Sequence, residues 1–116
     1  MTLDSRSCTP CRRGLPPMTL DEARARLPEV SGWTLDDEGT RISRRFSFSN
    51  FLMAMEFAGK VGELAEVEGH HPVLTIGWGF CRIELQTHKI KGLHENDFIM
   101  AAKISALFTR PKGFEY

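Results

Sequence analysis

Three of the four histidines in this 116-residue chain fall close to one predicted junction between a helix and a pair of strands. His70 and His71 directly precede Pro72, and His88 follows a segment of alternating apolar and polar residues. If the two strands form a hairpin, the start of one lies beside the end of the other, so the three histidines converge at one end of the sheet. Histidine both accepts and donates a proton near neutral pH. Three imidazoles around one pocket can therefore protonate a leaving group and deprotonate the atom beside it.

Two acidic residues and one aromatic residue could complete such a pocket. Glu66 precedes His70 by four residues, which places both on one face of a helix. Asp97 begins the last predicted helix, where a carboxylate interacts favourably with the helix dipole. A carboxylate can fix the tautomer of a nearby histidine, and the two-ring face of Trp33 can stack on a flat heterocycle.

Two other interpretations of this cluster stay open from the residues alone. Histidine pairs in loops and acids at helix ends also occur for purely structural reasons. Two or three histidines with a carboxylate can bind zinc or iron. Adjacent histidines such as His70 and His71 face one ion only where the backbone bends sharply, so we rank the metal site lower.

A second candidate metal motif lies near the N-terminus. Cys8 and Cys11 have the two-residue spacing that occurs in zinc and redox sites. A closed zinc site requires two further ligands, and the only other thiol, Cys81, falls on a predicted core strand. Because proline and glycine punctuate this region and few of its residues suit burial, we expect a flexible tail over residues 1–17, followed by one domain over residues 18–116.

Changes in hydrophobic period divide that domain into seven elements. Apolar residues at helical spacing predict helices over residues 20–27, 50–68 and 94–108. Alternation and turn residues predict strands over residues 33–35, 41–48, 73–78 and 80–87. Two hairpins joined by a long helix indicate an α+β fold in the order α-β-β-α-β-β-α, with a four-stranded antiparallel sheet and the helices packed on one face.

Several residues mark the ends of the predicted helices. Thr19 and Glu22 have the spacing of a capping box at the start of the first helix. Asn50 suits the N-cap of the long helix, and Gly69 suits a left-handed residue at its C-terminal end. Two further glycines lie inside the long helix, at positions 59 and 62, and we expect them to allow close packing against the sheet.

Composition and charge exclude several classes of function. The 15 basic and 15 acidic residues balance, so no basic excess favours nucleic acid. No apolar run approaches the roughly 20 residues of a membrane span, and the N-terminal residues contain no apolar core of a secretory signal. Three cysteines are an odd number, which favours a reducing cytosol over a disulfide framework. We therefore expect a cytoplasmic domain without a membrane or nucleic-acid partner.

The spacing of these residues resembles that of a known family. The motif consists of Glu66, His70-His71-Pro72, Trp78, His88 and Asp97. Two dipeptides outside this motif, Gly-Trp at 32–33 and Gly-Leu at 92–93, also match the family. The resemblance is to the pterin-4a-carbinolamine dehydratase family, also called the dimerization cofactor of hepatocyte nuclear factor family, and it extends over residues 19–108. Gaps of three, five, nine and eight residues separate the members of the motif.

The resemblance implies a reaction. Members of the family dehydrate 4a-hydroxytetrahydropterin to quinonoid dihydropterin, after an aromatic amino-acid hydroxylase has used the pterin. Water is lost across C4a and N5, so the departing hydroxyl needs a proton and N5 must lose one. Neither a metal nor a redox cofactor is required, which suits a site made of histidines.

The resemblance also implies roles for individual residues. We expect His70 and His88 to transfer protons on the two faces of the pterin, and His71 mainly to hold the substrate. Glu66 is expected to orient a histidine, and Trp33 to form a wall of the pocket.

Three further positions follow from the same comparison. Thr87 is expected to offer backbone groups to the edge of the pterin ring. Asp97 belongs to the motif as a substrate-site position, and we expect its side chain to cap the last helix or bond a loop histidine. His94 departs from the serine or threonine common at the start of the last helix, which predicts a weaker cap or an additional pocket histidine.

A non-catalytic protein is the main alternative. The same fold serves as a transcriptional coactivator and, in some relatives, as an assembly or regulatory protein. A degenerate binding module is expected to lose catalytic histidines, and this chain keeps three of them together with the glutamate. In either case we expect a homodimer or homotetramer, because the last helix has too many apolar residues for one narrow stripe, namely Phe98, Ile99, Met100 and Ile104.

Overall fold

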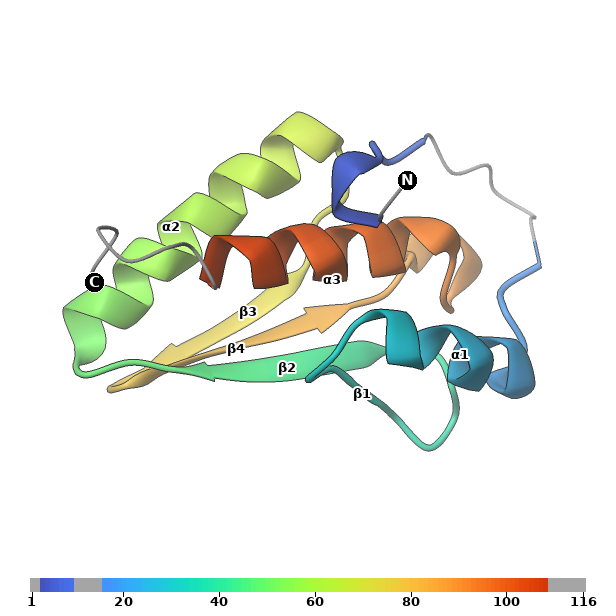
Figure 1. Ribbon diagram of the computed structural model, residues 1–116, viewed down its shortest axis with the longest axis horizontal. Coiled ribbons are helices and arrows are strands. Elements are labelled where there is room, and N and C mark those ends of the chain that lie inside the picture. Colours follow the sequence, from blue (N-terminus) through green and yellow to red (C-terminus); the bar gives the residue numbers. More distant parts are fainter. Residues whose placement is uncertain (1–2, 10–15, 109–116) are drawn as a thin grey trace.

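The predicted order of elements is confirmed by the computed structural model, which describes residues 3–9 and 16–108 (Figure 1). Three short 3-10 turns accompany them in the described residues: η1 (Leu3–Ser5), η2 (Leu27–Glu29) and η3 (His88–Ile90). The helices and strands are α1 (Leu20–Arg26), β1 (Thr34–Leu35), β2 (Ile42–Ser47), α2 (Phe51–Glu68), β3 (Val73–Gly77), β4 (Phe80–Leu85) and α3 (Glu95–Phe108).

The four strands form one antiparallel sheet in the order β1-β2-β4-β3. Helices α2 and α3 lie on the same face of this sheet, as Figure 1 shows, so the predicted α+β architecture is confirmed. The alternation in β4 explains which face they cover, because Cys81, Ile83 and Leu85 are buried while Arg82 and Glu84 between them are partly exposed. No helix in the described ranges has the length and apolar character that would let it cross a bilayer.

Aromatic side chains fill the space between the sheet and the helices. The Phe46 ring lies 4.8 Å from that of Phe57 and 4.9 Å from that of Phe108, measured between centroids. The apolar residues of α3 belong to this core as well. Phe98, Ile99, Met100 and Ile104 are at most 2% exposed within the single chain, so the predicted reason for self-association is wrong.

The ends of α2 follow the sequence prediction. The Asn50 side chain accepts a hydrogen bond from the Met53 amide at 2.9 Å, and Gly69 ends the helix with a φ of 68°. The interpretation of the two internal glycines is wrong, because a Cβ at Gly59 or Gly62 would meet no atom within 4 Å. These glycines therefore do not allow close packing against the sheet.

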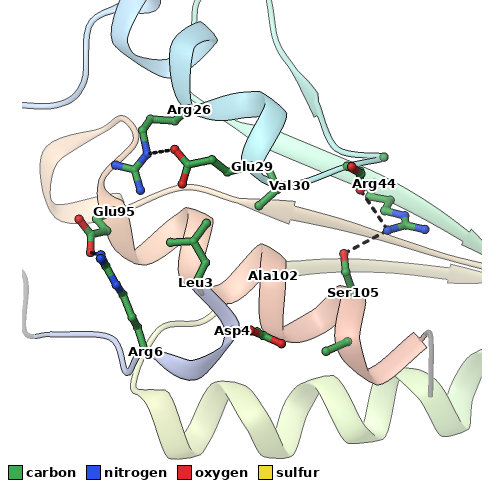
Figure 2. A pocket seen from close by; sticks show the side chains of 13 residues that line it. Leu3, Asp4, Arg6, Arg26, Glu29, Val30, Arg44, Glu95, Ala102 and Ser105 are labelled. Atoms are coloured by element: carbon green, nitrogen blue, oxygen red, sulfur yellow. Dashed lines mark hydrogen bonds and ion pairs between the residues drawn. The ribbon is translucent and has the colours of Figure 1, made fainter. Parts of the chain in front are cut away.

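The N-terminal segment, residues 3–9, lies along α3 (Figure 2). Leu3 packs against the core, and the Arg6 guanidinium pairs with the Glu95 carboxylate at 2.5 Å. The sequence predicted a flexible tail with few buried residues over this region. Cys11, the second thiol of the predicted two-cysteine motif, lies outside the described residues.

Gly69→Ala tests how firmly the turn after α2 depends on glycine. A Cβ at Gly69 meets no atom within 4 Å, so the cost is conformational, and we expect the free energy of unfolding to fall by about 1 kcal/mol. Gly59→Ala is the control, because alanine in an ordinary helical position should raise that free energy by up to ~1 kcal/mol. Urea denaturation measures both, and equal effects of the two substitutions would contradict this explanation.

Candidate active site

The turn at Gly69 and the pairing of β3 with β4 determine where the histidines lie. Gly69 reverses the chain after α2, so His70 and His71 fall on the short connection to β3. Antiparallel pairing places Val73, at the start of β3, opposite Glu84 near the end of β4. The connection before β3 therefore lies beside the residues that follow β4, and His88 is the first of the η3 turn there.

The three histidines line one cavity of about 440 Å³. His70, His71 and His88 all contribute to its wall, and Thr87 lies between the last strand and the η3 turn. The structure thus brings together the three imidazoles that the hairpin argument placed at one end of the sheet. The sequence analysis did not place the remaining lining residues in the site, and these include Cys8 and Thr9 of the N-terminal segment, Glu68 at the end of α2, Gln86 after β4 and Asn96 in the first turn of α3.

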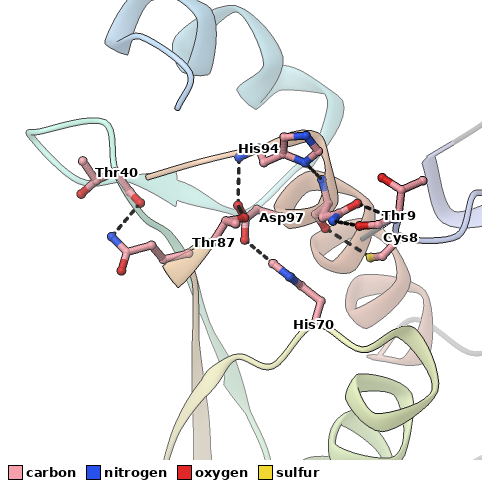
Figure 3. A network of polar contacts seen from close by, with 9 residues as sticks. Cys8, Thr9, Thr40, His70, Thr87, His94 and Asp97 are labelled. Carbon is pink, nitrogen blue, oxygen red and sulfur yellow. Dashed lines mark hydrogen bonds and ion pairs between the residues drawn. The ribbon is translucent and has the colours of Figure 1, made fainter. Parts of the chain in front are cut away.

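Asp97 ties the site together (Figure 3). Its Oδ1 lies 2.6 Å from Nε2 of His70, and its Oδ2 accepts hydrogen bonds from the Thr87 hydroxyl at 2.7 Å and from the His94 amide at 3.0 Å. The side chain is fully buried. Asp97 thus bonds a loop histidine and caps the start of α3, which the sequence analysis gave as alternatives, and it does not belong to the cavity wall as a substrate-site position.

The buried carboxylate gives His70 a defined orientation. An ionised carboxylate only accepts hydrogen bonds, so Nε2 of His70 must donate its proton to Asp97. In the neutral imidazole the other nitrogen, Nδ1, is then an acceptor. The side chain of His70 is 11% exposed, so its ring is largely screened from solvent where it lines the cavity.

The other two histidines are more open to solvent. Nε2 of His71 lies 2.5 Å from Oε2 of Glu66, and the two side chains are 59% and 78% exposed. An exposed pair of this kind holds an imidazole only weakly. The predicted helix face shared by Glu66 and His70 is wrong, because α2 ends at Glu68 and His70 bonds Asp97. His88 is also exposed, so its ring can exchange protons with water.

The structure does not bring Trp33 to this cavity. Its indole is 4% exposed and donates a hydrogen bond to the Ser105 hydroxyl at 2.8 Å, with its ring 6.1 Å from that of Phe46 in the core. The backbone groups of Thr87 are also engaged, because its N–H donates to Gly92 and its carbonyl accepts from Ile90. The contribution of Thr87 to the site is therefore the hydrogen bond that its hydroxyl donates to Asp97.

His94 acts as a cap. Its Nδ1 accepts a hydrogen bond from the Asn96 amide at 3.3 Å, while its own amide donates to Asp97. This pattern fits the expectation of a capping residue at the start of α3. As for the metal alternative, residues 3–9 and 16–108 contain no group of three His, Cys, Asp or Glu side chains arranged to hold an ion.

A larger cavity of about 1100 Å³ lies between α3, the N-terminal segment and the end of α1 with η2 (Figure 2). Arg26 and Glu29 line it as an ion pair at 2.9 Å, and Arg44 lines it while donating to Ser31 and Ser105. No histidine takes part in its wall. We place the candidate site in the smaller cavity, because that is where groups able to transfer protons meet.

Known proteins resemble this chain over most of its length. The family model described as pterin 4 alpha carbinolamine dehydratase matches residues 16–107. The chain belongs to this family. A Methylococcus capsulatus protein with the provisional name pterin-4-alpha-carbinolamine dehydratase is 58% identical over 106 residues, which cover 91% of this chain and 93% of the relative. An Aromatoleum aromaticum protein of the same provisional name is 56% identical over 105 residues, which cover 90% and 94%.

Solved structures of pterin dehydratase relatives share the fold. A Brucella melitensis protein described as a transcriptional coactivator/pterin dehydratase superposes with a TM-score of 0.73 at 31% identity, covering 78% of this chain and 97% of that one. A pterin dehydratase-like RuBisCO assembly factor of the alpha-carboxysome gives a TM-score of 0.59 at 22% identity, covering 69% and 93%, which shows the shared fold alone.

The two carboxylates that contact histidines should differ in their effect on stability. Asp97→Ala leaves the buried Thr87 hydroxyl without its acceptor and removes the partner of the His94 amide, so we expect the free energy of unfolding to fall by about 3 kcal/mol. Glu66→Ala removes an exposed contact and should change it by less than about 1 kcal/mol. Chemical denaturation of both variants checks this, and a larger loss for Glu66→Ala would contradict the assignment.

Proposed function

We propose that this protein dehydrates 4a-hydroxytetrahydropterin to quinonoid dihydropterin and water in the cytoplasm. The reaction would recycle the pterin that an aromatic amino-acid hydroxylase has oxidised. The observation that supports this most is that His70, bonded to the buried Asp97, lines one cavity together with His71 and His88. Membership of the family supports the same reaction. The reaction changes no oxidation state overall, so it needs no redox cofactor.

The arrangement accounts for each proton in the reaction. His88, in its protonated form, donates to the hydroxyl on C4a as the C–O bond breaks and water leaves. His70 accepts the proton of N5 on its Nδ1, and the electron pair of the N–H bond becomes the double bond between C4a and N5. Asp97 accepts the hydrogen bond of the Nε2–H group throughout and stabilises the imidazolium that forms. Exchange with water then restores both histidines.

His71 has a binding role in this proposal. Its ring lines the cavity and its Nε2 is held by Glu66 on the last turn of α2. Because that pair is exposed, it orients the ring only loosely, which suits contact with the substrate better than proton transfer timed to bond breaking.

The second candidate is a binding protein that has no dehydratase activity. The Brucella melitensis neighbour is described as both a coactivator and a dehydratase, so the fold alone does not decide between the two classes. The cavity lined by three imidazoles, one of them bonded to a buried carboxylate, provides proton-transfer groups that a binding module does not require. The enzyme therefore remains the better-supported function.

Stopped-flow absorbance tests the proposed reaction directly. Wild-type protein should accelerate the decay of enzymatically generated 4a-hydroxytetrahydropterin, and His70→Ala or His88→Ala should lower the rate between about 100-fold and 10,000-fold. His71→Ala should mainly raise KM. Thermal unfolding of the same variants provides the control, because a loss of activity matched by a loss of folding would remove the catalytic roles. A folded wild type without activity would favour the binding protein.

A homo-oligomer is also part of this proposal. The apolar residues exposed on the single chain lie on α2 and the β3–β4 hairpin, where Leu52 is 66% and Trp78 is 72% exposed. Apolar side chains of this size commonly become buried between subunits. Light scattering at micromolar concentration should give a mass of at least twice 13.1 kDa. Leu52→Lys should shift the mass toward the monomer, and a monomeric wild type would contradict the proposal.

A further inference from the structure

The proposed reaction leaves the N-terminal segment without a role. Residues 3–9 lie along α3, and two of them, Cys8 and Thr9, form part of the wall of the histidine cavity. Segments that only decorate a surface make few specific polar contacts, so the contacts of this one indicate whether it belongs to the site.

The clearest contact joins Thr9 to Asn96. The Thr9 amide donates to Oδ1 of Asn96 at 3.0 Å, and Nδ2 of Asn96 donates back to the Thr9 carbonyl at 2.6 Å. Asn96 is 2% exposed, so its amide group would lack these partners if the segment moved away. These two hydrogen bonds, made where water has little access, stabilise the docked segment.

Further contacts hold the same segment, in addition to the Arg6–Glu95 ion pair. The Cys8 amide donates to Oε1 of Glu68 at 2.8 Å, and Nζ of Lys103 donates to the Asp4 carbonyl at 3.1 Å. Lys103 also lies 3.6 Å from Glu68, so one ion pair joins the end of α2, the middle of α3 and the segment. Burial, followed by the nearby Glu68 charge, raises the pKa of the Cys8 thiol to about 12.

The anchor of the segment is next to the catalytic pair in the chain. Asn96 directly precedes Asp97 in the first turn of α3, and Asp97 holds His70. Figure 3 shows Cys8 and Thr9 on one side of this turn and His70 on the other. Displacement of the segment would therefore open the cavity beside the imidazole that accepts the N5 proton.

We propose that the N-terminal segment is a substrate-binding wall of the histidine cavity and that Asn96 is the positioning residue that holds it there. The wall keeps the pterin ring against His70 and excludes water from that side of the cavity. This inference rests on the proposed function for the identity of the ligand, but the docking of the segment can be measured without it.

Thr9→Pro and Thr9→Ala form a matched pair. Proline removes the N–H that Asn96 accepts, whereas alanine keeps both backbone groups. In a Cys11→Ser background without pterin, alkylation of Cys8 by iodoacetamide, followed by peptide mass spectrometry, reports the docked state. Displacement exposes the thiol and lowers its pKa toward the ordinary value, so Thr9→Pro should speed alkylation at least about tenfold. Thr9→Ala should match the parent, and an equal rate in all three proteins would overturn the docking.

A double-mutant cycle identifies the partner. Asn96→Ala should speed Cys8 alkylation in the same way, and combining it with Thr9→Pro should add little, because both remove one contact. Fully additive effects would show that Asn96 does not hold Thr9.

Steady-state kinetics then distinguishes a segment that binds the substrate from one that has only a structural role. Thr9→Pro should raise KM about tenfold, because the displaced segment no longer contacts the pterin, and tenfold corresponds to the loss of about one good contact. It should leave kcat within about twofold of the parent. Faster alkylation with an unchanged KM would overturn the substrate-binding role.

Protection of Cys8 by biopterin against alkylation tests the substrate-binding segment separately from the dehydratase activity. If the wild type is folded but does not accelerate dehydration, the proposed function fails. Biopterin should nevertheless slow Cys8 alkylation in the parent and in Thr9→Ala but not in Thr9→Pro. An absence of protection in the parent would overturn the binding wall.

Discussion

The site depends on one buried carboxylate. Asp97 is the single charged side chain that is fully buried among the described residues, and burial of a charge is stable only where hydrogen bonds replace its water. Its partners come from three places: His70 follows α2, Thr87 follows β4, and the His94 amide begins α3. The carboxylate therefore holds three segments in register around one cavity, and the orientation of the imidazole follows from that.

The rest of the fold supplies the geometry that Asp97 requires. The left-handed residue at Gly69 turns the chain after α2, and the pairing of β3 with β4 brings that turn beside the end of the sheet. The aromatic core between sheet and helices fixes the position of α3, whose first turn presents Asp97 to the loop. A small protein can thus orient a proton-transfer group with two short connections and one helix terminus.

Features set by neighbouring residues were predictable from the sequence, and the convergence of the three histidines followed from the expected hairpin. The packing of single side chains and the contacts of the backbone were not predictable. The alternation in β4, the Asn50 cap and the left-handed Gly69 depend on neighbouring residues, so their patterns are visible in the chain. The indole of Trp33 has the same chemistry in a core as in a pocket, and only the packing against Phe46 decides between them. Thr9 meets Asn96 through its backbone, 87 residues away, and a backbone contact leaves no pattern of side chains to recognise.

The most direct test of this account is a crystal structure of the protein with a bound dihydropterin. We predict that the pteridine ring occupies the cavity of about 440 Å³, with N5 within hydrogen-bond distance of Nδ1 of His70 and with Asp97 still bonded to Nε2 of that histidine. His88 should lie on the C4a side of the ring. A pterin bound instead in the larger cavity beside Arg44, or a His70 turned away from Asp97 in the complex, would contradict the account.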